Sequence, residues 1–391
     1  MERIGVDPAG IRIMLDKQFH YNFKVEQLTP AQANVIKQEL LSAGGEAAIS
    51  RGSASCRIPF TDAILSGTLK QFKILIEKLK TQPFGLDQAA RDIAGALENI
   101  LKKELCVKRR KDGAFWTFGR RTVIMGVLNV TPDSFYDGGK FLNADEAVSR
   151  GLEMIKDGAD WIDIGGQSSR PGALPVTLEE ELKRVVPVVE ALAKKGVTVS
   201  VDTTKAEVAR QAFKAGAEII NDISAFEADP DMARVCAEAG APVVLMHMRG
   251  TPETMQKDVH YDDLTSEVFN YLSGRVAYAK SCGIDPESII IDPGIGFGKS
   301  AEGNLELIKN LAEFKTLGRP VLVGLSRKSF ISAVTGNATA PAERLSGTLA
   351  AGAVAVQNGA HILRVHDVKE AREAATIADA LKASRADNGS V

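Results

Sequence analysis

Three polar residues near the ends of apolar runs suit the recognition of a flat, polar heterocycle. Asp202 ends one run, Asn221 lies near the end of the next, and Asp292 ends a third. A carboxylate accepts hydrogen bonds and an amide both donates and accepts, so this set matches a ring edge that carries donors and acceptors. The glycines within 294–298 allow backbone to approach a planar ring closely. We therefore expect these side chains to bind a heterocyclic substrate.

Cationic residues at equivalent positions suit an anion. Lys328, Arg364 and His366 follow apolar runs, as does Arg170, and Asn129 ends the first run. Guanidinium and ammonium groups bind phosphate oxygens through charge-assisted hydrogen bonds. These residues are candidates for holding a phosphate or pyrophosphate. The sequence shows no Ser-His-Asp order and no dense Asp/Glu/His metal cage. The residues alone predict a barrel enzyme for a phosphorylated heterocycle and leave the reaction open.

The elements that must position these residues alternate. From Val123 onward, an apolar run is repeatedly followed by an amphipathic helical pattern, and several of these helices end at Gly. The expected strands are 123–130, 161–165, 197–202, 218–223, 242–247, 288–292, 320–325 and 361–366. The expected helices are 144–157, 178–195, 205–216, 232–239, 263–282, 303–317, 343–358 and 369–384. This predicts an α/β fold, a (β/α)8 TIM barrel with its chemistry on the loops after the strands. A doubly wound sheet alternates similarly, but no G-x-G-x-x-G turn follows the first strand.

The first third of the chain reads as a small α+β domain. Its expected strands are 11–14, 21–25, 47–50 and 63–66. Its expected helices run from Thr29-Pro30 to residues 44–45, over 69–80 and over 86–103. The charged run 108–112 is interpreted as a solvated linker. The predicted domains are therefore 1–113, a stabilising, docking or oligomerisation domain with no visible catalytic cluster, and 114–391, the catalytic barrel.

Composition limits the partners and the compartment. Lys and Arg number 48 against 50 Asp and Glu, a net charge of −2, so we expect neither a nucleic-acid nor a membrane partner. No apolar run approaches the ~20 residues of a membrane helix. Four widely spaced cysteines, Cys56, Cys106, Cys236 and Cys282, form no CxxC pair. We expect free thiols in a reducing, cytoplasmic compartment.

Taken together, the loops resemble those of dihydropteroate synthases. The segments that carry the resemblance are Asn129–Gly139, Ile162–Gly172, Ser200–Thr203, Asn221–Ser224, Leu245–Met248, Asp292–Lys299, Gly324–Phe330 and Arg364–Val368. The match covers roughly 114–385 and leaves out the first domain. The resemblance implies condensation of 6-hydroxymethyl-7,8-dihydropterin pyrophosphate with p-aminobenzoate, which gives 7,8-dihydropteroate and pyrophosphate. This is a step of folate biosynthesis and the target of sulfonamides. The resemblance also implies Mg²⁺ and a homodimer.

The resemblance further implies a role for each matching residue. The pterin would be held by Asp202, Asn221, Met246, Asp292, Lys328 and Arg364. The pyrophosphate would be held by Asn129, Arg170, Arg364 and His366, with Mg²⁺ at Asn129. The p-aminobenzoate would be surrounded by Phe135, Ser169, Arg170, Pro171, Phe297 and Ser329. The expected catalytic residues are Asp133, Lys328, Arg364 and His366, with Asp133 near the cation that forms as pyrophosphate leaves.

The second loop departs from the family pattern, which usually reads Gly-Gly-Glu-Ser-Thr-Arg. Ser169 keeps the hydroxyl of the usual Thr, but Gln167 removes the charge of the usual Glu. Two alternatives stay open. A corrinoid-type pterin-binding methyltransferase would share the barrel and the pterin carboxylates. It would not need the Asn129–Asp133 loop, the Ser-Arg-Pro-Gly loop or a pyrophosphate-binding Arg and His pair, all of which are present. A non-catalytic pterin-binding protein would explain Gln167 as a sign of lost activity.

Overall fold

The chain forms two compact units. A computed structural model describes residues 1–131, 144–167, 176–251, 254–255, 259–336 and 339–389, with side chains described up to residue 383. The first unit comprises Met1–Leu101 with Ala386–Val391, and the second comprises Lys102–Arg385. Each unit has its own hydrophobic core.

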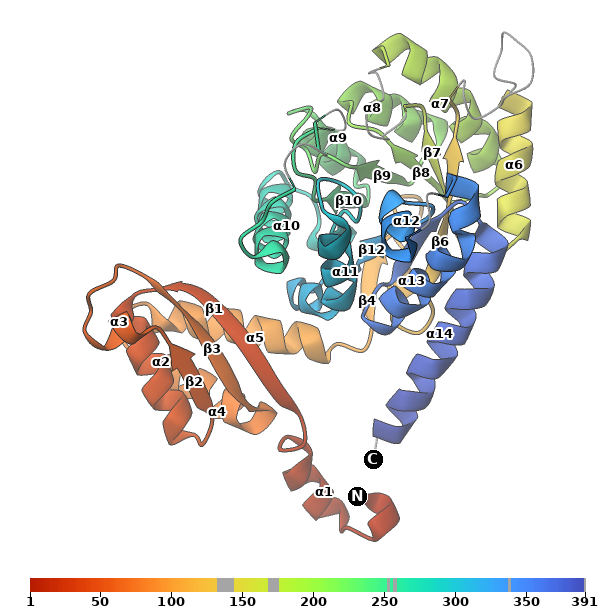
Figure 1. Ribbon diagram of the computed structural model, residues 1–391. Coiled ribbons are helices and arrows are strands. Elements are labelled where there is room, and N and C mark those ends of the chain that lie inside the picture. The colour runs from red at the N-terminus through yellow and green to blue at the C-terminus, as the bar shows by residue number, and fades with distance from the viewer. Residues whose placement is uncertain (132–143, 168–175, 252–253, 256–258, 337–338, 390–391) are drawn as a thin grey trace. The chain divides into compact units, whose positions relative to one another are not determined.

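The first unit is a three-stranded antiparallel sheet backed by helices (Figure 1). Its strands pair in the order β1-β3-β2, and residues of β3 alternate between buried and more exposed positions. One face of the sheet therefore packs on the helices, and Phe23 and Phe72 meet edge to face at 5.0 Å in that core. The elements are α1 (Pro8–Leu15), β1 (His20–Leu28), α2 (Pro30–Ser42), β2 (Glu46–Ile49), α3 (Arg51–Ala54), β3 (Thr61–Thr68), α4 (Leu69–Leu79) and α5 (Leu86–Leu101).

The sequence prediction for this unit is confirmed for most elements, but the short α3 was not expected and one expected strand is wrong. The strands expected at 21–25, 47–50 and 63–66 and the three expected helices are present. The strand expected at 11–14 is wrong, because these residues lie in α1. The Asp7 side chain accepts a hydrogen bond from the Ala9 N–H at 2.8 Å, and Pro8 occupies the first helical position. This N-cap and proline favour the start of a helix. The short apolar run at 11–14, considered alone, had suggested a strand.

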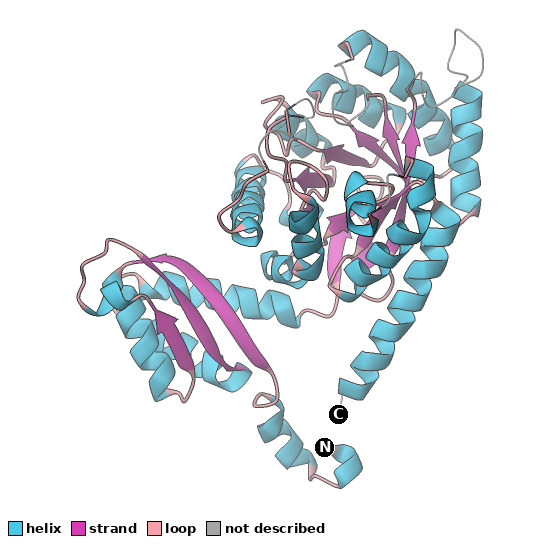
Figure 2. Cartoon of the chain, in the orientation of Figure 1, coloured by secondary structure: helices cyan, strands magenta, loops and turns pink. Residues whose placement is uncertain are grey.

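The second unit is a closed eight-stranded parallel barrel surrounded by helices, as predicted (Figure 2). Its strands are β6 (Val123–Asn129), β7 (Trp161–Gly165), β8 (Val199–Asp202), β9 (Ile219–Asp222), β10 (Val243–Met246), β11 (Ile289–Asp292), β12 (Leu322–Val323) and β13 (Ile362–Val365). They pair in the order β11-β10-β9-β8-β7-β6-β13-β12, and a parallel bridge between Ile291 and Val321 closes the ring. All eight strands fall where the apolar runs were expected.

The barrel helices follow the predicted alternation with two differences. They are α6 (Ala144–Lys156), α7 (Leu178–Lys194), α8 (Ala206–Ala215), α9 (Met232–Ala239), α10 (Leu264–Ser281), α11 (Ala301–Lys309), α12 (Ser329–Thr335), α13 (Leu345–Gln357) and α14 (Val368–Gly389). The helix expected over 303–317 is divided into α11 and a 3-10 helix at Leu311–Leu317. The short α12, which begins at Ser329, was not expected.

A β-hairpin packs against the barrel strands at their amino ends. It consists of β4 (Leu105–Lys108) and β5 (Phe115–Phe118). Phe118 lies edge to face on Trp161 at 5.9 Å, and both belong to a buried cluster with strand residues such as Val123. The charged run 108–112 therefore lies within this hairpin, with Lys108 at the end of β4 and the rest in the connection, and is not an interdomain linker. The two units divide after Leu101, earlier than the boundary expected at 113.

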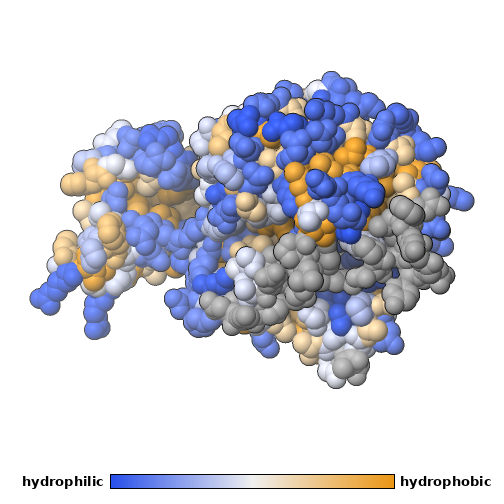
Figure 3. Space-filling view, turned by 90° about the horizontal axis from the view of Figure 1, so that it is seen from above, coloured by the Kyte–Doolittle hydropathy of each residue, from blue (hydrophilic) through white to orange (hydrophobic). Residues whose placement is uncertain are grey.

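The surface of the described residues is mixed in character. On the face drawn in Figure 3, hydrophobic residues gather in patches between predominantly hydrophilic ones. In the part of the chain that the structure describes, no helix combines the length and the apolar character needed to cross a membrane.

Candidate active site

Four of the barrel strands end in one layer at the carboxyl edge. Asn129 on β6 is the register partner of Gly165 on β7, which pairs with Asp202 on β8, which pairs with Asn221 on β9. Register partners on parallel strands lie side by side, so the predicted pterin and pyrophosphate residues on these strands converge. The lack of a side chain at Gly165 leaves room between its two polar neighbours.

Arg364 lies between two carboxylates inside this mouth. Its Nε donates to Asp163 Oδ2 at 2.6 Å, and its Nη2 donates to Asp202 Oδ2 at 2.7 Å. Asp163 is fully buried, so the ion pair is shielded from water. Although burial disfavours the guanidinium, the carboxylates of Asp163 and Asp202 raise the pKa of Arg364. The arginine is charged and fixed in orientation before any ligand arrives.

Asp163 is a site residue that the sequence analysis missed. It lies within the apolar run of β7, two positions before Gly165, and residues two apart on a strand face the same side. The signal available in the sequence was a single carboxylate within an otherwise apolar run. Asp163 Oδ2 also accepts from Asn221 Nδ2 at 3.0 Å. Because a carboxylate only accepts here, this bond fixes the orientation of the Asn221 amide. Asp163 Oδ1 is buried and accepts no hydrogen bond within the described part of the chain.

Asp292 and the glycine loop after β11 form another side of the mouth. Asp292 Oδ1 accepts from the Gly294 N–H at 2.7 Å, which orients the carboxylate. Gly294 has a φ of 71°, and a Cβ there would lie 1.9 Å from the carbonyl oxygen of His247. Only glycine is compatible with both the backbone angle and this contact. Burial raises the pKa of Asp292. Met246 is buried and is the register partner of Asp292.

Lys328 reaches this loop from the N-terminal end of α12. Its Nζ donates to the carbonyl oxygen of Ile295 and lies 4.1 Å from the centre of the Phe297 ring. Burial lowers the pKa of Lys328 to about 7, and the neighbouring Asp292 opposes this shift. Burial likewise raises the pKa of Asp202 to about 7, against the effect of Arg364. The mouth thus holds an acid and a base whose pKa values are both shifted to about 7.

A second lysine, the buried Lys299, makes hydrogen bonds within the same loop. The sequence analysis did not single it out. Its Nζ donates to the carbonyl oxygen of Phe297 at 2.9 Å and lies 2.9 Å from His247 Nδ1. Burial, with the nearby Lys299 and Arg249, lowers the pKa of His247 to about 2, so this imidazole is neutral. These contacts join the loop after β10 to the loop after β11.

The remaining predicted residues divide into two groups. His366, after β13, has Nδ1 3.1 Å from Ser326 Oγ, and Ser329 is the exposed first residue of α12. The structure thus brings together the following predicted residues: Asn129, Asp202, Asn221, Met246, Asp292, Phe297, Lys328, Ser329, Arg364 and His366. The other predicted residues, Asp133, Phe135, Ser169, Arg170 and Pro171, lie outside the described residues.

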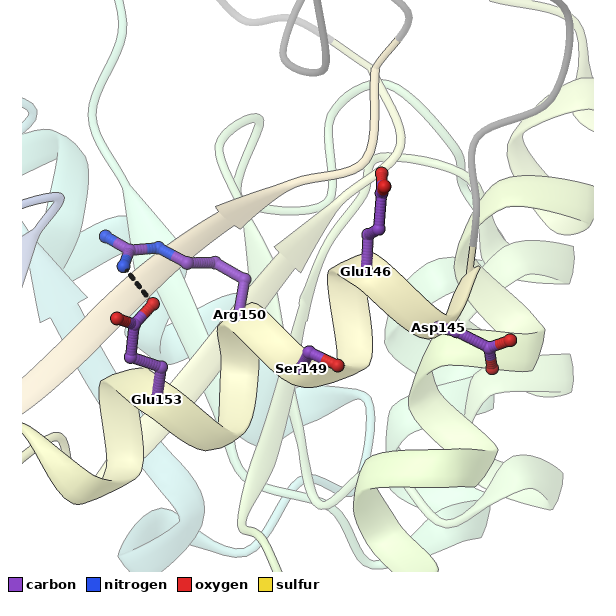
Figure 4. A pocket seen from close by; sticks show the side chains of 5 residues that line it. All are labelled: Asp145, Glu146, Ser149, Arg150 and Glu153. Atoms are coloured by element: carbon purple, nitrogen blue, oxygen red, sulfur yellow. Dashed lines mark hydrogen bonds and ion pairs between the residues drawn. The ribbon is translucent and has the colours of Figure 1, made fainter.

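A second hollow on the barrel unit lacks the features expected of an active site. It is lined by Asp145, Glu146, Ser149, Arg150 and Glu153, all from α6, and Arg150 pairs with Glu153 at 2.5 Å (Figure 4). The side chains come from one exposed helical face and do not converge from several elements. A binding site needs convergent polar groups in a desolvated pocket. The cluster at the carboxyl ends of the strands is therefore the candidate active site.

Comparison with known proteins agrees with this location. Residues 125–366 match the family described as pterin binding enzyme. The chain is 49% identical over 265 residues to a dihydropteroate synthase of Synechocystis sp., which covers 68% of this chain and 91% of that protein. A solved structure of Xanthomonas albilineans dihydropteroate synthase with 4-aminobenzoic acid aligns with a TM-score of 0.66 at 45% identity, covering 71% of this chain and 99% of that one.

One relative extends the similarity to the first unit. A probable bifunctional folylpolyglutamate synthase/dihydropteroate synthase of Halobacterium salinarum is 44% identical over 382 residues. The alignment covers 98% of this chain but 45% of that protein. The chain thus spans less than half the length of this curated relative.

Proposed function

The chain belongs to the dihydropteroate synthase family of pterin-binding enzymes, and we propose that it condenses 6-hydroxymethyl-7,8-dihydropterin pyrophosphate with p-aminobenzoate. The products are 7,8-dihydropteroate and pyrophosphate. The observation that carries the proposal is the placement of Arg364 between Asp163 and Asp202, with Asn221, Asp292 and Lys328 at the same mouth of the barrel. This set combines acceptors for a heterocycle with fixed positive charge for a leaving group.

The carboxylates supply the acceptors that a pterin requires. A pterin ring donates from a ring N–H and an exocyclic amine on one edge, and one carboxylate accepts both bonds. Asp292 has this capacity, because Gly294 occupies one lone pair of Oδ1 and leaves Oδ2 for the ligand. Asp202 and Asn221, from neighbouring strands, bind the other polar atoms of the ring. Lys328 donates to the ring from the side of Phe297.

The cationic groups stabilise the departing pyrophosphate. Arg364 uses Nε and Nη2 for its two carboxylates, which leaves the Nη1 donors for phosphate oxygens. His366 and Asn129 add contacts from the adjacent strands β13 and β6. The C–O bond breaks, pyrophosphate departs with the bonding electrons, and the amine of p-aminobenzoate attacks the cationic carbon and loses a proton. Catalysis then rests on preorganised charge and on neutralisation of the leaving group. Asp133, Phe135, Ser169, Arg170 and Pro171 keep the roles that the resemblance implies.

We propose Mg²⁺ as the cofactor, held at Asn129. Among the described residues, no group of three or more His, Cys, Asp or Glu side chains could hold a metal by itself. Mg²⁺ commonly retains waters and binds through few protein oxygens together with substrate phosphates. The side-chain oxygen of Asn129, half-buried at the mouth, fits such a site. When bound, the ion neutralises charge on pyrophosphate.

We propose a homodimer formed through α13 and α14. Helix α13 is apolar nearly all round, which is typical of a helix buried on every side. Yet Val354 is 50% exposed on α13, and Ile377 and Leu381 are 65% and 56% exposed on α14. The two helices contact each other, since Gln357 Nε2 donates to the carbonyl oxygen of Ala378 at 2.5 Å. A second copy covering this face would remove these side chains from water.

We also propose a cytoplasmic location and a supporting role for the first unit. Cys56, Cys106, Cys236 and Cys282 are all free, which suits a reducing compartment. The first unit, which we identify with the predicted stabilising or oligomerisation domain, supplies none of the described groups of the mouth. The catalytic residues of the proposal all belong to the barrel unit.

The test of the function is pyrophosphate release by the full chain. The protein is incubated with the dihydropterin pyrophosphate, p-aminobenzoate and Mg²⁺, and each is left out in turn. Release that requires both organic substrates, with dihydropteroate formed in equal amount, is the expected result. Tight pterin binding without release would support the non-catalytic alternative. Absence of pterin binding would overturn the proposal.

A further inference from the structure

Arg327 has a backbone conformation that few residues other than glycine adopt. Its φ is 61°, in the left-handed region, and it directly precedes Lys328 in the loop after β12. Both of its backbone polar groups are fixed by side chains from outside this loop. Its N–H donates to Thr348 Oγ1 at 3.0 Å, and its carbonyl oxygen accepts from Arg344 Nη1 at 2.8 Å. A strained conformation that its surroundings hold in place is typical of functional sites, so Arg327 is a candidate for a role beyond packing.

The side chain of Arg327 joins the loop after β12 to the loop after β13. Its Nε donates to Asp367 Oδ2 at 2.9 Å, and its Nη2 donates to Asp367 Oδ1 at 2.5 Å. Two parallel bonds of this kind fix the orientation of the guanidinium as well as its distance from the carboxylate. At the preceding position of both loops, the His366 N–H donates to Ser326 Oγ at 3.3 Å. The two loops are therefore joined at two successive positions, and one of these contacts is an ion pair.

The two joined loops carry residues with different proposed roles. Lys328 follows Arg327 and, in the proposed function, donates to the pterin ring. His366 precedes Asp367 and contacts the pyrophosphate. Arg364 is already held by its two carboxylates on β7 and β8. The placement of Lys328 relative to His366 depends instead on the contacts between the two loops.

We propose that Arg327 and Asp367 are positioning residues whose ion pair holds the pterin-binding and the pyrophosphate-binding sides of the mouth in one geometry. This inference rests on the proposed function, which assigns Lys328 and His366 to these two sides. Neither Arg327 nor Asp367 needs to touch the substrate. A ligand that spans both sides gains from contacts that are already aligned, because less freedom is lost when it binds. A ligand that occupies one side does not depend on this alignment.

Arg327→Gly separates positioning from a structural role. Glycine adopts a φ of 61° without strain, so the turn of the backbone is kept while the ion pair is lost. We expect a melting temperature close to that of the wild type, because relief of strain offsets the loss of a partly exposed pair. By calorimetry, the Kd of 6-hydroxymethyl-7,8-dihydropterin pyrophosphate rises about tenfold, as for the loss of charge-assisted hydrogen bonds. The Kd values of 6-hydroxymethyl-7,8-dihydropterin and of inorganic pyrophosphate, measured separately, stay within about twofold.

Asp367→Asn tests the same pair from the other loop. The asparagine keeps the shape of the side chain but removes its charge and one of its two acceptors. Alone, it raises the Kd of the dihydropterin pyrophosphate, as Arg327→Gly does. Combined with Arg327→Gly, it adds less than about twofold, because residues that act through one contact are not additive.

A matched control is Arg121→Gly at the amino end of the barrel. Arg121 forms a similar two-bond pair with Asp160, at 2.6 and 3.4 Å. Its loss leaves all three Kd values unchanged. The inference is overturned if Arg327→Gly binds the dihydropterin pyrophosphate like the wild type, if its three Kd values rise together, or if the two substitutions act additively. Absence of pterin binding by the wild-type chain would contradict the proposed function and the inference with it, whereas the other three outcomes contradict the inference alone.

Discussion

Arg364 donates from Nε to the buried carboxylate of Asp163 at 2.6 Å, although 201 positions separate the two residues in the chain. The contact passes over β6 from β13 to β7 and is present without any ligand. A buried ion pair of this kind contributes little net stability, because both charges lose their hydration. Its value lies in orientation, since it holds a guanidinium in the geometry that a phosphorylated substrate needs.

Asp163→Asn is expected to reduce turnover more than it reduces stability. The amide keeps the shape of the side chain but removes the charge that holds Arg364, while Asp202 remains as a partner. We expect kcat/KM for the pterin substrate to fall about a hundredfold and the free energy of unfolding to fall by about 1–3 kcal/mol. Steady-state kinetics and urea unfolding measure the two effects. Wild-type kcat/KM in a folded variant would contradict the role given to Asp163.

Asp292→Asn is expected to abolish most pterin binding. The Gly294 N–H will keep the amide oxygen as its acceptor, which turns the Asn NH2 group toward the position that Asp292 Oδ2 occupies. A donor then meets the donors of the pterin ring, and affinity should fall at least about a hundredfold by calorimetry.

The control for this change is Asp222→Asn on β9. Asp222 is also fully buried, but its oxygens accept from the Ser224 and Phe226 N–H groups. This variant should lose stability and keep its pterin affinity once folded. Equal affinity of the Asp292 variant and the wild type would refute the assignment of Asp292.

The barrel strands could be predicted because their residues are buried on both faces, which gives continuous apolar runs. Asp202 and Asp292 could be predicted because they stand where those runs end. Asp163 could not, because its partner Arg364 is distant in sequence and only the closed barrel brings them together. The hairpin around 108–112 was missed for a similar reason. Its short strands are stabilised by packing on Trp161, which local sequence does not reveal.

The pH dependence of pterin binding should be bell-shaped, with a maximum near pH 7. Burial raises the pKa of Asp202 to about 7, and this residue must be ionised to accept from the ring. Burial lowers the pKa of Lys328 to about 7. This residue must be protonated to offer a charged donor to the pterin ring. Loss of either charge weakens binding, so Asp202 governs the acid side of the profile and Lys328 the alkaline side. Affinity measured between pH 5 and pH 9 should fall on either side of the maximum.

Lys328→Arg tests which group governs the alkaline side of that profile. Arginine stays charged throughout the range, so the fall above pH 7 should disappear while the acid side remains. An unchanged alkaline side would show that Lys328 is not the group.

The ionisation of Asp202 should affect folding stability in the direction opposite to its effect on pterin binding. Its folded pKa exceeds the unfolded value of 3.8, so its contribution to the free energy of unfolding falls as pH rises toward 7.

Removal of the first unit should leave the chemistry intact. A chain that begins at Lys102 keeps the hairpin β4–β5, whose residues Leu105 and Phe118 pack on the barrel strands. We expect kcat within about twofold of the full chain, because every described catalytic group lies in the barrel unit. Beginning at Ala114 instead would remove β4, expose the cluster around Trp161 and lower the melting temperature. A folded but inactive barrel unit would show that the first unit contributes to the site.

Charge introduced on the apolar face of α13 and α14 should separate the proposed dimer. Ile377→Asp with Leu381→Asp places two carboxylates where a second copy would bury apolar side chains, and like charges from both copies would face each other. Light scattering after gel filtration should show a dimer for the wild type and a monomer for this variant. Leu178→Asp, at the first position of α7 and 39% exposed, is the matched control and should remain dimeric. A variant of α14 that keeps the wild-type mass would place the interface elsewhere.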